Sequence, residues 1–445
     1  MKKPIVYYAI AIYLGCFSLA LFHFSYVISI LVAATFFIVI YIHEDVKGFS
    51  LISGFFIIGY MSYFIYFNFH VEDTAIFRVL EMKKGYYTAN YKGRIVYLNG
   101  RLNGIKGGDK IRAVGKFEEA REYSRGSIGR YQVKYFSKEK EDFIRKLYSF
   151  RDELYVKYSK ALDARKASIV MAACYGDTKY LSYEQKDEFN KLGIIHIISV
   201  SGFHIAIVYK LLEKIFGLKL ALLISAIYMV FTGSEAATVR AFIMILILKL
   251  SKLTYKNYDS ISSLSLAALI LLLIKPYYVL DIGFNLSFLA TLGIILYNKK
   301  LQKILYKLPK NINESLSITL SSQVFSMPYA MGTIKSISMF FIPGNLIVVP
   351  LYSVVVILGT IGILAYKVEP LFVIITSLLY SNLTILDGLI YTLLKVSPPI
   401  SEYNFFYALC MIIIFISFVL VKYGYSKIRY FPIFLFCLII MYNMV

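Results

Sequence analysis

Long uninterrupted apolar runs constrain this chain more than any other feature. Three of them, at residues 5–22, 26–42 and 49–69, follow one another with only short polar turns between them. Each run approaches the roughly 20 apolar residues that a helix needs to cross a bilayer. We therefore expect three retained membrane-spanning helices rather than a cleaved secretory signal, although two lysines precede the first run.

Apolar runs resume at residue 194, so the sequence predicts a polytopic α-helical membrane protein with ten to thirteen helices. Composition supports this class, because 58% of the residues are hydrophobic and only 17% are charged, against about a quarter in soluble domains. A broken or re-entrant helix is a hypothesis for the stretch around Pro343 and Pro350. The expected later spans are residues 194–212, 218–231, 236–250, 261–274, 282–297, 316–330, 337–365, 371–394, 403–421 and 430–445.

A basic segment at residues 71–136 interrupts the membrane pattern. It contains 14 Lys plus Arg against 7 Asp plus Glu, and its apolar residues alternate with polar ones in runs such as 91–98 and 111–117. Period-two alternation bounded by Gly-rich turns predicts β-strands. We therefore expect a three-helix segment at residues 1–70, a small extracytoplasmic β domain at 71–136, amphipathic linker helices at 137–191 and a transmembrane domain at 192–445.

The linker is predicted to contain an amphipathic helix. Phe143, Leu147, Phe150, Leu154 and Ala161 recur at helical spacing, which places them on one face. Such a helix lies on the membrane surface or packs on the β domain, and the sequence leaves both alternatives open.

Lysine clusters predict the topology, because cytoplasmic loops are enriched in Lys and Arg. An amino terminus inside the cell puts the β domain outside, all three later basic clusters inside and Val445 outside. The basic excess of the β domain is not explained by this rule. The inside clusters are Lys249, Lys252 and Lys256, then Lys299, Lys300, Lys303, Lys307 and Lys310, and finally Lys422, Lys427 and Arg429.

Polar residues interrupt four of the apolar runs, where they are costly and usually face a cavity or a partner helix. In the first, KLGIIHIISVSGFHIAIV, His196 and His204 flank Ser199, Ser201 and Gly202. Hydroxyls that bond to the helix backbone and small residues that permit close packing are the structural alternatives.

The second interruption, FTGSEAATVRAFIM, combines Glu235 with Arg240. A Gly-rich break before a helix exposes amide donors, and Arg offers a planar fork suited to phosphate. A structural ion pair between Glu235 and Arg240 is the alternative. The remaining interruptions are LDIGFNLSFLATLGI, with Asp281, Asn285 and Ser287, and IPGNLIVVPL, with Asn345.

Four ordered motifs resemble the competence domain of the ComEC/Rec2 family: HIISVSGFHIAIV, TVRAFIM, LDIGFNLSFLATLGI and QVFSMPYAMGTIKSISMFFIPGNLIVVPL. That family forms the inner-membrane channel for incoming single-stranded DNA in bacterial natural transformation. The layout of three helices, a small extracytoplasmic domain of OB-fold type and a linker is similar too. Many family members have glutamine at the position of Asn285, and longer ones continue into a metallo-β-lactamase-like domain. Because this sequence stops at Val445, we expect another protein to perform any hydrolysis.

The resemblance implies a transport channel of the bacterial cytoplasmic membrane, not an enzyme, without cofactor or metal. The implied partners are single-stranded DNA, the lipid bilayer, an extracytoplasmic DNA receptor and nuclease, and a cytoplasmic helicase-like motor; the oligomeric state is not predicted. The expected channel or motif residues are His196, Ser199, Ser201, Gly202, His204, Glu235, Arg240, Asp281, Asn285, Ser287, Gln323 and Asn345, and the expected DNA-binding residues of the OB-like domain are Lys92, Arg94, Arg101, Tyr91 and Tyr97.

Two other function classes stay open as alternatives. An intramembrane hydrolase would use Ser201 with His204 or His196, but the chain has no GxSxG elbow. A secondary transporter of another solute is expected to show inverted repeats, and no convincing internal duplication is present. Neither a metal-type histidine spacing nor a P-loop occurs in the sequence.

Overall fold

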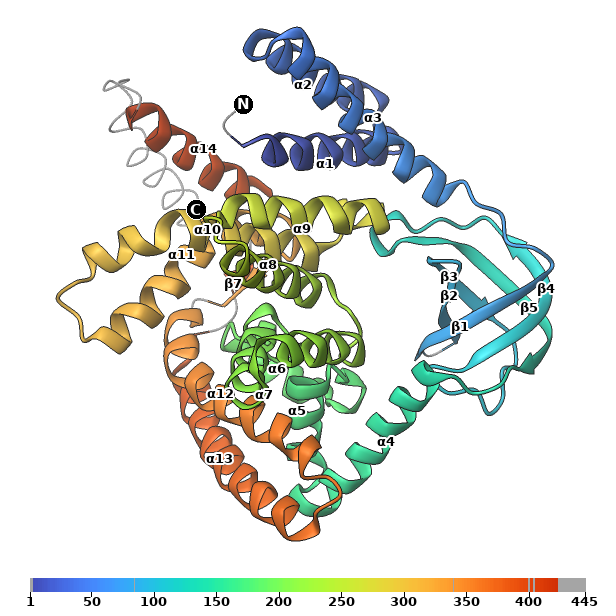
Figure 1. Ribbon diagram of the computed structural model, residues 1–445, viewed down its shortest axis with the longest axis vertical. Coiled ribbons are helices and arrows are strands. Elements are labelled where there is room, and N and C mark those ends of the chain that lie inside the picture. Colours follow the sequence, from blue (N-terminus) through green and yellow to red (C-terminus); the bar gives the residue numbers. More distant parts are fainter. Residues whose placement is uncertain (1–2, 84, 339, 399–400, 403–404, 423–445) are drawn as a thin grey trace.

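A computed structural model describes residues 3–83, 85–338, 340–398, 401–402 and 405–422, and it is mostly helical with one small β-barrel (Figure 1). Seven helices of this described part are long and apolar enough to cross a membrane, so the chain is a polytopic membrane protein. The expected span at 430–445, together with Lys427 and Arg429, lies outside the described residues. The seven helices are α1 (Pro4–Phe22), α2 (Tyr26–His43), α3 (Val46–Phe67), α7 (Gly202–Phe231), α10 (Ile282–Ile304), α12 (Phe341–Leu364) and α13 (Glu369–Val396).

The first three helices match the three leading apolar runs. Asp45 begins α3 as an N-cap, since its carboxylate accepts a hydrogen bond from the Gly48 N–H at 3.1 Å. Helices α1 and α3 cross at very short range: a Cβ added to Gly15 would lie 2.2 Å from the carbonyl oxygen of Phe56. Small residues at such crossings let two helix backbones approach closely inside a membrane.

Five strands close into a barrel with the order β1-β2-β3-β5-β4. All neighbouring pairs are antiparallel except β3 and β5, which run parallel. The expected strand at 111–117 falls within β4, whereas the expected run at 91–98 is divided by a turn before β3 begins. The strands are β1 (Thr74–Lys83), β2 (Tyr86–Tyr91), β3 (Arg94–Asn99), β4 (Lys110–Glu118) and β5 (Ser127–Lys138).

The barrel is fixed to the helices where the chain enters it from α3. The hydroxyl of Tyr66 donates to the carbonyl oxygen of Gly126 at 2.9 Å, which joins the end of α3 to the start of β5. Nε of Arg94 donates to the carbonyl oxygen of Tyr66 at 3.0 Å. These bonds hold the barrel against the end of α3.

A second joint fixes the barrel where the chain leaves it into α4 (Phe143–Leu162). Arg78 of β1 forms a two-pronged ion pair with Asp142, which is also the N-cap of α4 and accepts from the Arg145 N–H at 3.0 Å. This contact lowers the pKa of Asp142 to about 2, mainly because the Arg78 hydrogen bond favours the carboxylate. Arg145 also pairs with the buried Asp109 at 2.7 Å.

Helix α4 packs into the helical body rather than lying freely on a surface. Leu154, Tyr158 and Leu162 are buried in one core with α5 (Ala164–Tyr175), α12 and α13. The expected apolar face is therefore confirmed for Leu154, whereas Phe143 at its start is 63% exposed. The start of α4 thus contacts the β domain, as one alternative expected, whereas the rest of the helix packs against other helices, which neither alternative expected.

The expected division between spans 194–212 and 218–231 is confirmed by a kink at Gly217, where φ is 74°, although both halves belong to α7. The expected start of the first span is wrong, because α7 begins only at Gly202. The expectation of a broken helix around Pro343 and Pro350 is also wrong, because helix α12 continues through Pro350. Proline is tolerated inside a membrane helix because neighbouring helices satisfy the backbone carbonyl that it leaves without a hydrogen bond. The remaining helices are α6 (Tyr183–Lys191), α8 (Ala236–Leu253), α9 (Ser260–Ile274), α11 (Lys310–Thr333) and α14 (Phe405–Lys422), with β6 (Ser336–Ile337) pairing β7 (Ser401–Glu402).

The helix ends fall into two groups. Lys3, before α1, pairs with Asp259 in the α8–α9 loop at 2.6 Å, so this loop lies at the opposite end of α1 from the barrel. The α9–α10 linker contacts the barrel end instead, where the rings of Tyr66 and Tyr277 lie 5.3 Å apart. The turn between α10 and α11 also lies far from the barrel (Figure 1).

Candidate functional site

Arg240, on α8, brings three of the four sequence motifs together. Its Nη1 donates hydrogen bonds to the carbonyl oxygen of Ser287 and to the hydroxyl of Thr291, both on α10. Its Nη2 lies against the start of α7, because a Cβ added to Gly202 would come within 2.5 Å of that nitrogen. One guanidinium therefore connects α7, α8 and α10.

No carboxylate of the described residues lies beside Arg240. The alternative of an ion pair with Glu235 is not realised; the guanidinium is buried and lies 5.9 Å from the centre of the Phe288 ring. Its Nε has no hydrogen-bond partner in the described part of the chain. A buried charge is unfavourable unless polar groups or a ligand compensate it. Among the described residues, the charge of Arg240 is thus compensated by a carbonyl, a hydroxyl and the Phe288 ring, without a carboxylate.

The histidine motif builds the start of α7. Nδ1 of His204 accepts a hydrogen bond from the backbone N–H of Ser201 at 2.7 Å, an arrangement of the capping-box type. His204 is buried, whereas His196 and Ser199 are exposed. Because the His204 nitrogen that faces Ser201 binds its backbone and not its hydroxyl, this geometry gives the hydrolase alternative no support.

The fourth motif packs against the first. A Cβ added to Gly344 of α12 would lie 2.5 Å from the carbonyl oxygen of Leu192. The Asn345 side chain donates through Nδ2 to the carbonyl oxygen of Phe341 at 2.7 Å, which fixes it at the start of α12. The four motifs therefore form one contact group, here called the motif junction: residues 192–204, Arg240, Ser287, Thr291, Gly344 and Asn345.

Asn285 is a buried hub beside the motif junction. Its Nδ2 donates to the carbonyl oxygens of Val279 and Asp281, each at 2.9 Å, and to the hydroxyl of Tyr329 at 3.1 Å. Its Oδ1 accepts from the hydroxyl of Tyr13 at 3.0 Å. This one amide joins α1, the start of α10 and α11, so the structure gives it a positioning role.

Glu235 and Asp281 belong to a second group of charges at the barrel end. Both carboxylates interact electrostatically with Lys275, and Asp281 together with Glu81 of β1 acts on Glu235. Gln323 lies on α11 and hydrogen-bonds within that helix. The described contacts therefore leave these three predicted site residues, Glu235, Asp281 and Gln323, outside the motif junction.

The two barrel tyrosines expected to stack on DNA bases are buried. Tyr91 is 3% exposed and Tyr97 is 8% exposed. The Tyr97 hydroxyl donates to Glu122 at 2.8 Å, and burial together with this carboxylate raises the pKa of Tyr97 to about 12. Neither ring offers a free face to a ligand in this arrangement.

The three expected basic residues of the barrel differ in their surroundings. Arg94 lies 3.8 Å from the centre of the Phe69 ring and helps to fasten the barrel to α3. Lys92 pairs with Glu72 at 3.1 Å. Arg101 is exposed. Of the three, Arg101 alone makes no hydrogen bond, ion pair or ring contact with another described residue.

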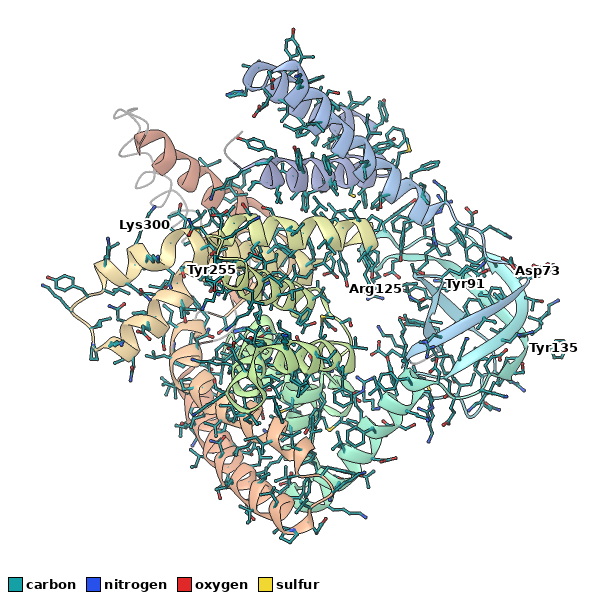
Figure 2. All side chains as sticks on the ribbon, viewed as in Figure 1. Asp73, Tyr91, Arg125, Tyr135, Tyr255 and Lys300 are labelled. Atoms are coloured by element: carbon teal, nitrogen blue, oxygen red, sulfur yellow. The ribbon has the colours of Figure 1, made fainter. Side chains whose placement is uncertain are left out.

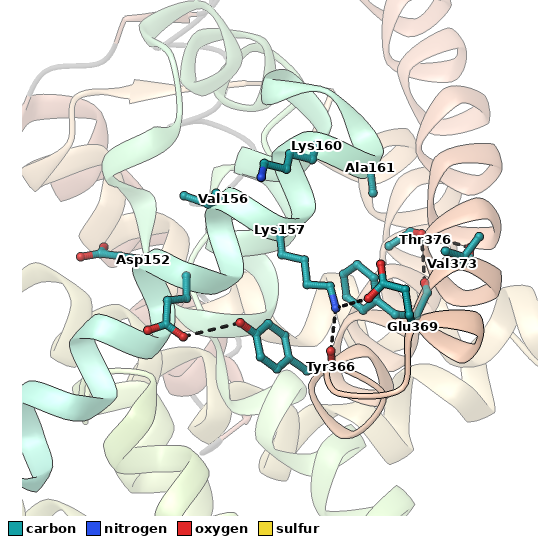
Figure 3. A pocket seen from close by; sticks show the side chains of 11 residues that line it. Asp152, Val156, Lys157, Lys160, Ala161, Tyr366, Glu369, Val373 and Thr376 are labelled. Carbon is teal, nitrogen blue, oxygen red and sulfur yellow. Dashed lines mark hydrogen bonds and ion pairs between the residues drawn. The ribbon is translucent and has the colours of Figure 1, made fainter.

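A groove with a volume of about 750 Å³ lies elsewhere, between α4 and the α12–α13 turn. Figure 3 shows Lys157 at its centre, where Nζ donates to Glu369 at 2.8 Å and to the carbonyl oxygen of Tyr366 at 2.6 Å. None of the residues predicted from sequence lines this groove. The groove is therefore not the candidate site.

Three residues of the site were not expected from the sequence. Thr291 lies four residues after Ser287, and that spacing on one helix face could have suggested it. Tyr13 and Tyr329 bind Asn285 from distant parts of the chain. Tyr329 lies within the fourth of the ordered motifs, whereas Tyr13 lies in the first apolar run, where no motif marks it.

Comparison with known proteins bears on the same region. A family model described as Competence protein matches residues 174–426. ComE operon protein 3 of Bacillus subtilis (strain 168) is 26% identical over 233 residues, which cover 50% of this chain and 30% of that protein. No solved structure matches the chain.

Two further relatives carry no functional name. A protein of Aquifex aeolicus is 28% identical over 212 residues, covering 46% of this chain and 49% of its own length. Uncharacterized protein MG316 of Mycoplasma genitalium is 29% identical over 177 residues, covering 37% of this chain and 47% of its own length. The matched stretch thus spans less than half of each of these relatives.

Proposed function

Because the chain belongs to the competence protein family, we propose that it forms an inner-membrane channel that passes single-stranded DNA into the cytoplasm during natural transformation. In this proposal the amino terminus lies inside and the barrel outside. The channel acts without nuclease or ATPase chemistry of its own. An extracytoplasmic receptor and nuclease, and a cytoplasmic helicase-like motor, supply the other steps.

The observation that carries the proposal is the motif junction around Arg240. A strand of DNA brings one negative charge per nucleotide, so its path through low dielectric requires polar groups and positive potential that do not trap it. Arg240 supplies such a charge without a carboxylate partner among the described residues. A passing phosphate would be a transient partner for the guanidinium, because the fork matches phosphate geometry.

The barrel supports the outer part of the proposal. Its order β1-β2-β3-β5-β4, with a parallel β3–β5 pair, is the connectivity of a small closed barrel of OB type. OB folds commonly bind single strands through basic grooves and stacked aromatic rings. We therefore assign the barrel as an OB-like domain that receives DNA outside the membrane.

The distribution of helix ends supports the proposed orientation. Lys3 and the α8–α9 loop, which carries Lys256, lie together at the end of α1 that is remote from the barrel. An inside location of that end agrees with the preference of Lys and Arg for cytoplasmic loops.

The test is a deletion of the gene in its host, scored separately for DNA bound at the cell surface and for nuclease-resistant DNA inside the cell. We expect surface binding to persist and internal DNA to fall to background. Complementation with the intact gene is the control. Normal internalisation in the deletion strain would contradict the proposal.

A further inference from the structure

An exposed basic surface covers the outer side of β4 and β5. Lys116, Arg130 and Lys134 are exposed, and their side chains make no ion pair or hydrogen bond with another described residue. Strand alternation places Arg130 and Gln132 on one face of β5, and Lys116 lies opposite Gln132 in the register of β4 and β5. The register shifts at Lys134, which has no partner on β4, and both Lys134 and the next residue, Tyr135, are exposed. We call this surface, together with the exposed Tyr135, the β4–β5 face.

Aromatic and apolar groups are part of the same face. Tyr135 is 75% exposed, and Val114, its register partner on β4, is 41% exposed. Figure 2 places Tyr135 at the edge of the barrel that lies farthest from the helices. An exposed aromatic ring among unpaired cations is the combination on which single-stranded nucleic acids bind, since bases stack and phosphates pair.

The acidic residues nearby do not neutralise this face. Glu118 is the register partner of Arg130, and the two form no ion pair among the described residues. The neighbouring Glu119 pairs with Arg121 at 2.9 Å. Glu139 pairs with Arg112 at 2.9 Å, farther along β4. The three free cations therefore keep their charge available to a ligand.

The opposite side of the barrel is already occupied. The β2–β3 side holds Arg94 against the end of α3, and Tyr97 is bonded to Glu122. A ligand that binds the barrel therefore has more access at β4 and β5. This placement differs from the residues expected from sequence, of which only Arg101 is exposed without a hydrogen bond, ion pair or ring contact to another described residue.

From these observations we propose that the β4–β5 face binds the phosphate chain of a single-stranded nucleic acid, with Tyr135 stacking on a base. Arg130 and Lys134 are four residues apart on one strand, which is about 13 Å at the strand rise. Cations spread over that length suit an extended polyanion, whereas a small anion needs convergent donors. The inference rests on the proposed function, because it names where the transported strand is received.

The test uses the full-length protein in nanodiscs of zwitterionic lipid and a fluorescent oligo(dT) of about 16 nucleotides, with anisotropy read at several salt concentrations. The variant Lys116→Gln/Arg130→Gln/Lys134→Gln is expected to bind about tenfold more weakly or worse. Its plot of log binding constant against log salt is expected to lose a slope of about 2, since three phosphate contacts contribute about 0.7 each.

The matched control removes the same charge elsewhere on the barrel. Lys92→Gln/Arg101→Gln/Lys106→Gln changes three basic residues outside the β4–β5 face and is expected to bind within about twofold of the wild type, with its salt slope unchanged. Equal losses of oligo(dT) affinity in both variants would show that only the net charge of the barrel matters. A loss of affinity in the control alone would place the binding site outside the β4–β5 face. Either result overturns the proposal.

Stacking and lipid binding are tested separately. Tyr135→Ala is expected to weaken binding about fivefold or more, whereas Tyr135→Phe retains it because the ring remains. Unchanged binding by Tyr135→Ala overturns the stacking part. If the triple variant loses binding to vesicles of anionic lipid but not to oligo(dT), the face binds lipid headgroups and the proposal fails.

The two proposals can fail independently. Oligo(dT) binding through this face, combined with normal DNA internalisation in the deletion strain, would contradict the channel and leave the face intact. Loss of internalisation without any oligo(dT) binding by the wild-type protein would contradict the face and leave the channel intact.

Discussion

At the scale of single residues, Arg240 is the residue of the motif junction whose charge is most costly to bury. A guanidinium is costly to bury even with good acceptors, and here it has a carbonyl, a hydroxyl and a Nε without a partner. Such a residue is retained in apolar surroundings when its charge or its geometry is used. The two explanations predict different behaviour for conservative variants.

We expect Arg240→Lys to reduce DNA internalisation about tenfold or more, although it keeps the charge. Lysine lacks the planar fork that spans Ser287 and Thr291, so it cannot make the same pair of contacts. The measurement is nuclease-resistant DNA in cells that contain equal amounts of each protein, determined by immunoblot. Arg165→Lys, at an exposed arginine on α5, is the matched control. Wild-type internalisation by Arg240→Ala would remove this residue from the site.

Sequence patterns identified the junction residues but not all of their roles. Polar residues in apolar runs marked His204 and Asn285, because such residues need partners wherever the chain folds. The capping role of His204 depends on a local hydrogen bond that its motif did not reveal. The buried state of Tyr91 could not be predicted, since strand alternation defines two faces but not which one other elements cover.

At the scale of elements, the joint between the barrel and α4 depends on the ionised form of Asp142. Its pKa is lowered to about 2 by Arg78, below the value of about 3.9 for an unfolded aspartate. The stabilisation is therefore fully present above pH 4 and is lost as the pH falls through about 2. Because both side chains are partly exposed, the contribution is below about 1 kcal/mol.

The variant that tests this joint is Asp142→Asn, because asparagine keeps an N-cap for α4 and removes the charge that pairs with Arg78. We expect the wild-type protein to unfold at a higher temperature than the variant at pH 5, and the difference to disappear near pH 2. Thermal unfolding of the solubilised protein at both pH values measures it. A difference that stays constant across this range would show that the Arg78 pair does not stabilise the joint.

Element boundaries were predictable where hydrophobicity changes and not where geometry does. The leading helices follow contiguous apolar runs that end at polar turns, so their limits are visible in the sequence. The kink of α7 at Gly217 falls between two expected spans, so the sequence marked it, whereas the start at Gly202 depends on an extended Ser201 inside an apolar run. That start does not change the periodicity from which spans are predicted.

At the scale of the whole molecule, the prediction is that the barrel and the α10–α11 turn lie on opposite sides of the membrane. Arg101 and Lys303 are both exposed, so single cysteines at these positions are accessible to reagents. In intact cells an impermeant thiol reagent is expected to label position 101 and not position 303. Labelling of both positions after permeabilisation is the control, and the reverse pattern in intact cells would overturn the topology.

The two joints of the barrel have a mechanical consequence. Tyr66 binds the barrel where the chain enters it, and Asp142 binds it where the chain leaves it. With both ends bound, the barrel does not change its orientation as a domain on a flexible linker would. A tethered module samples a wide volume, and its effective concentration at one point is correspondingly low. Here the distance and direction from the barrel to the helices are set once, when the chain folds. A polymer held on the barrel would therefore start each passage from the same position, with no search between capture and threading.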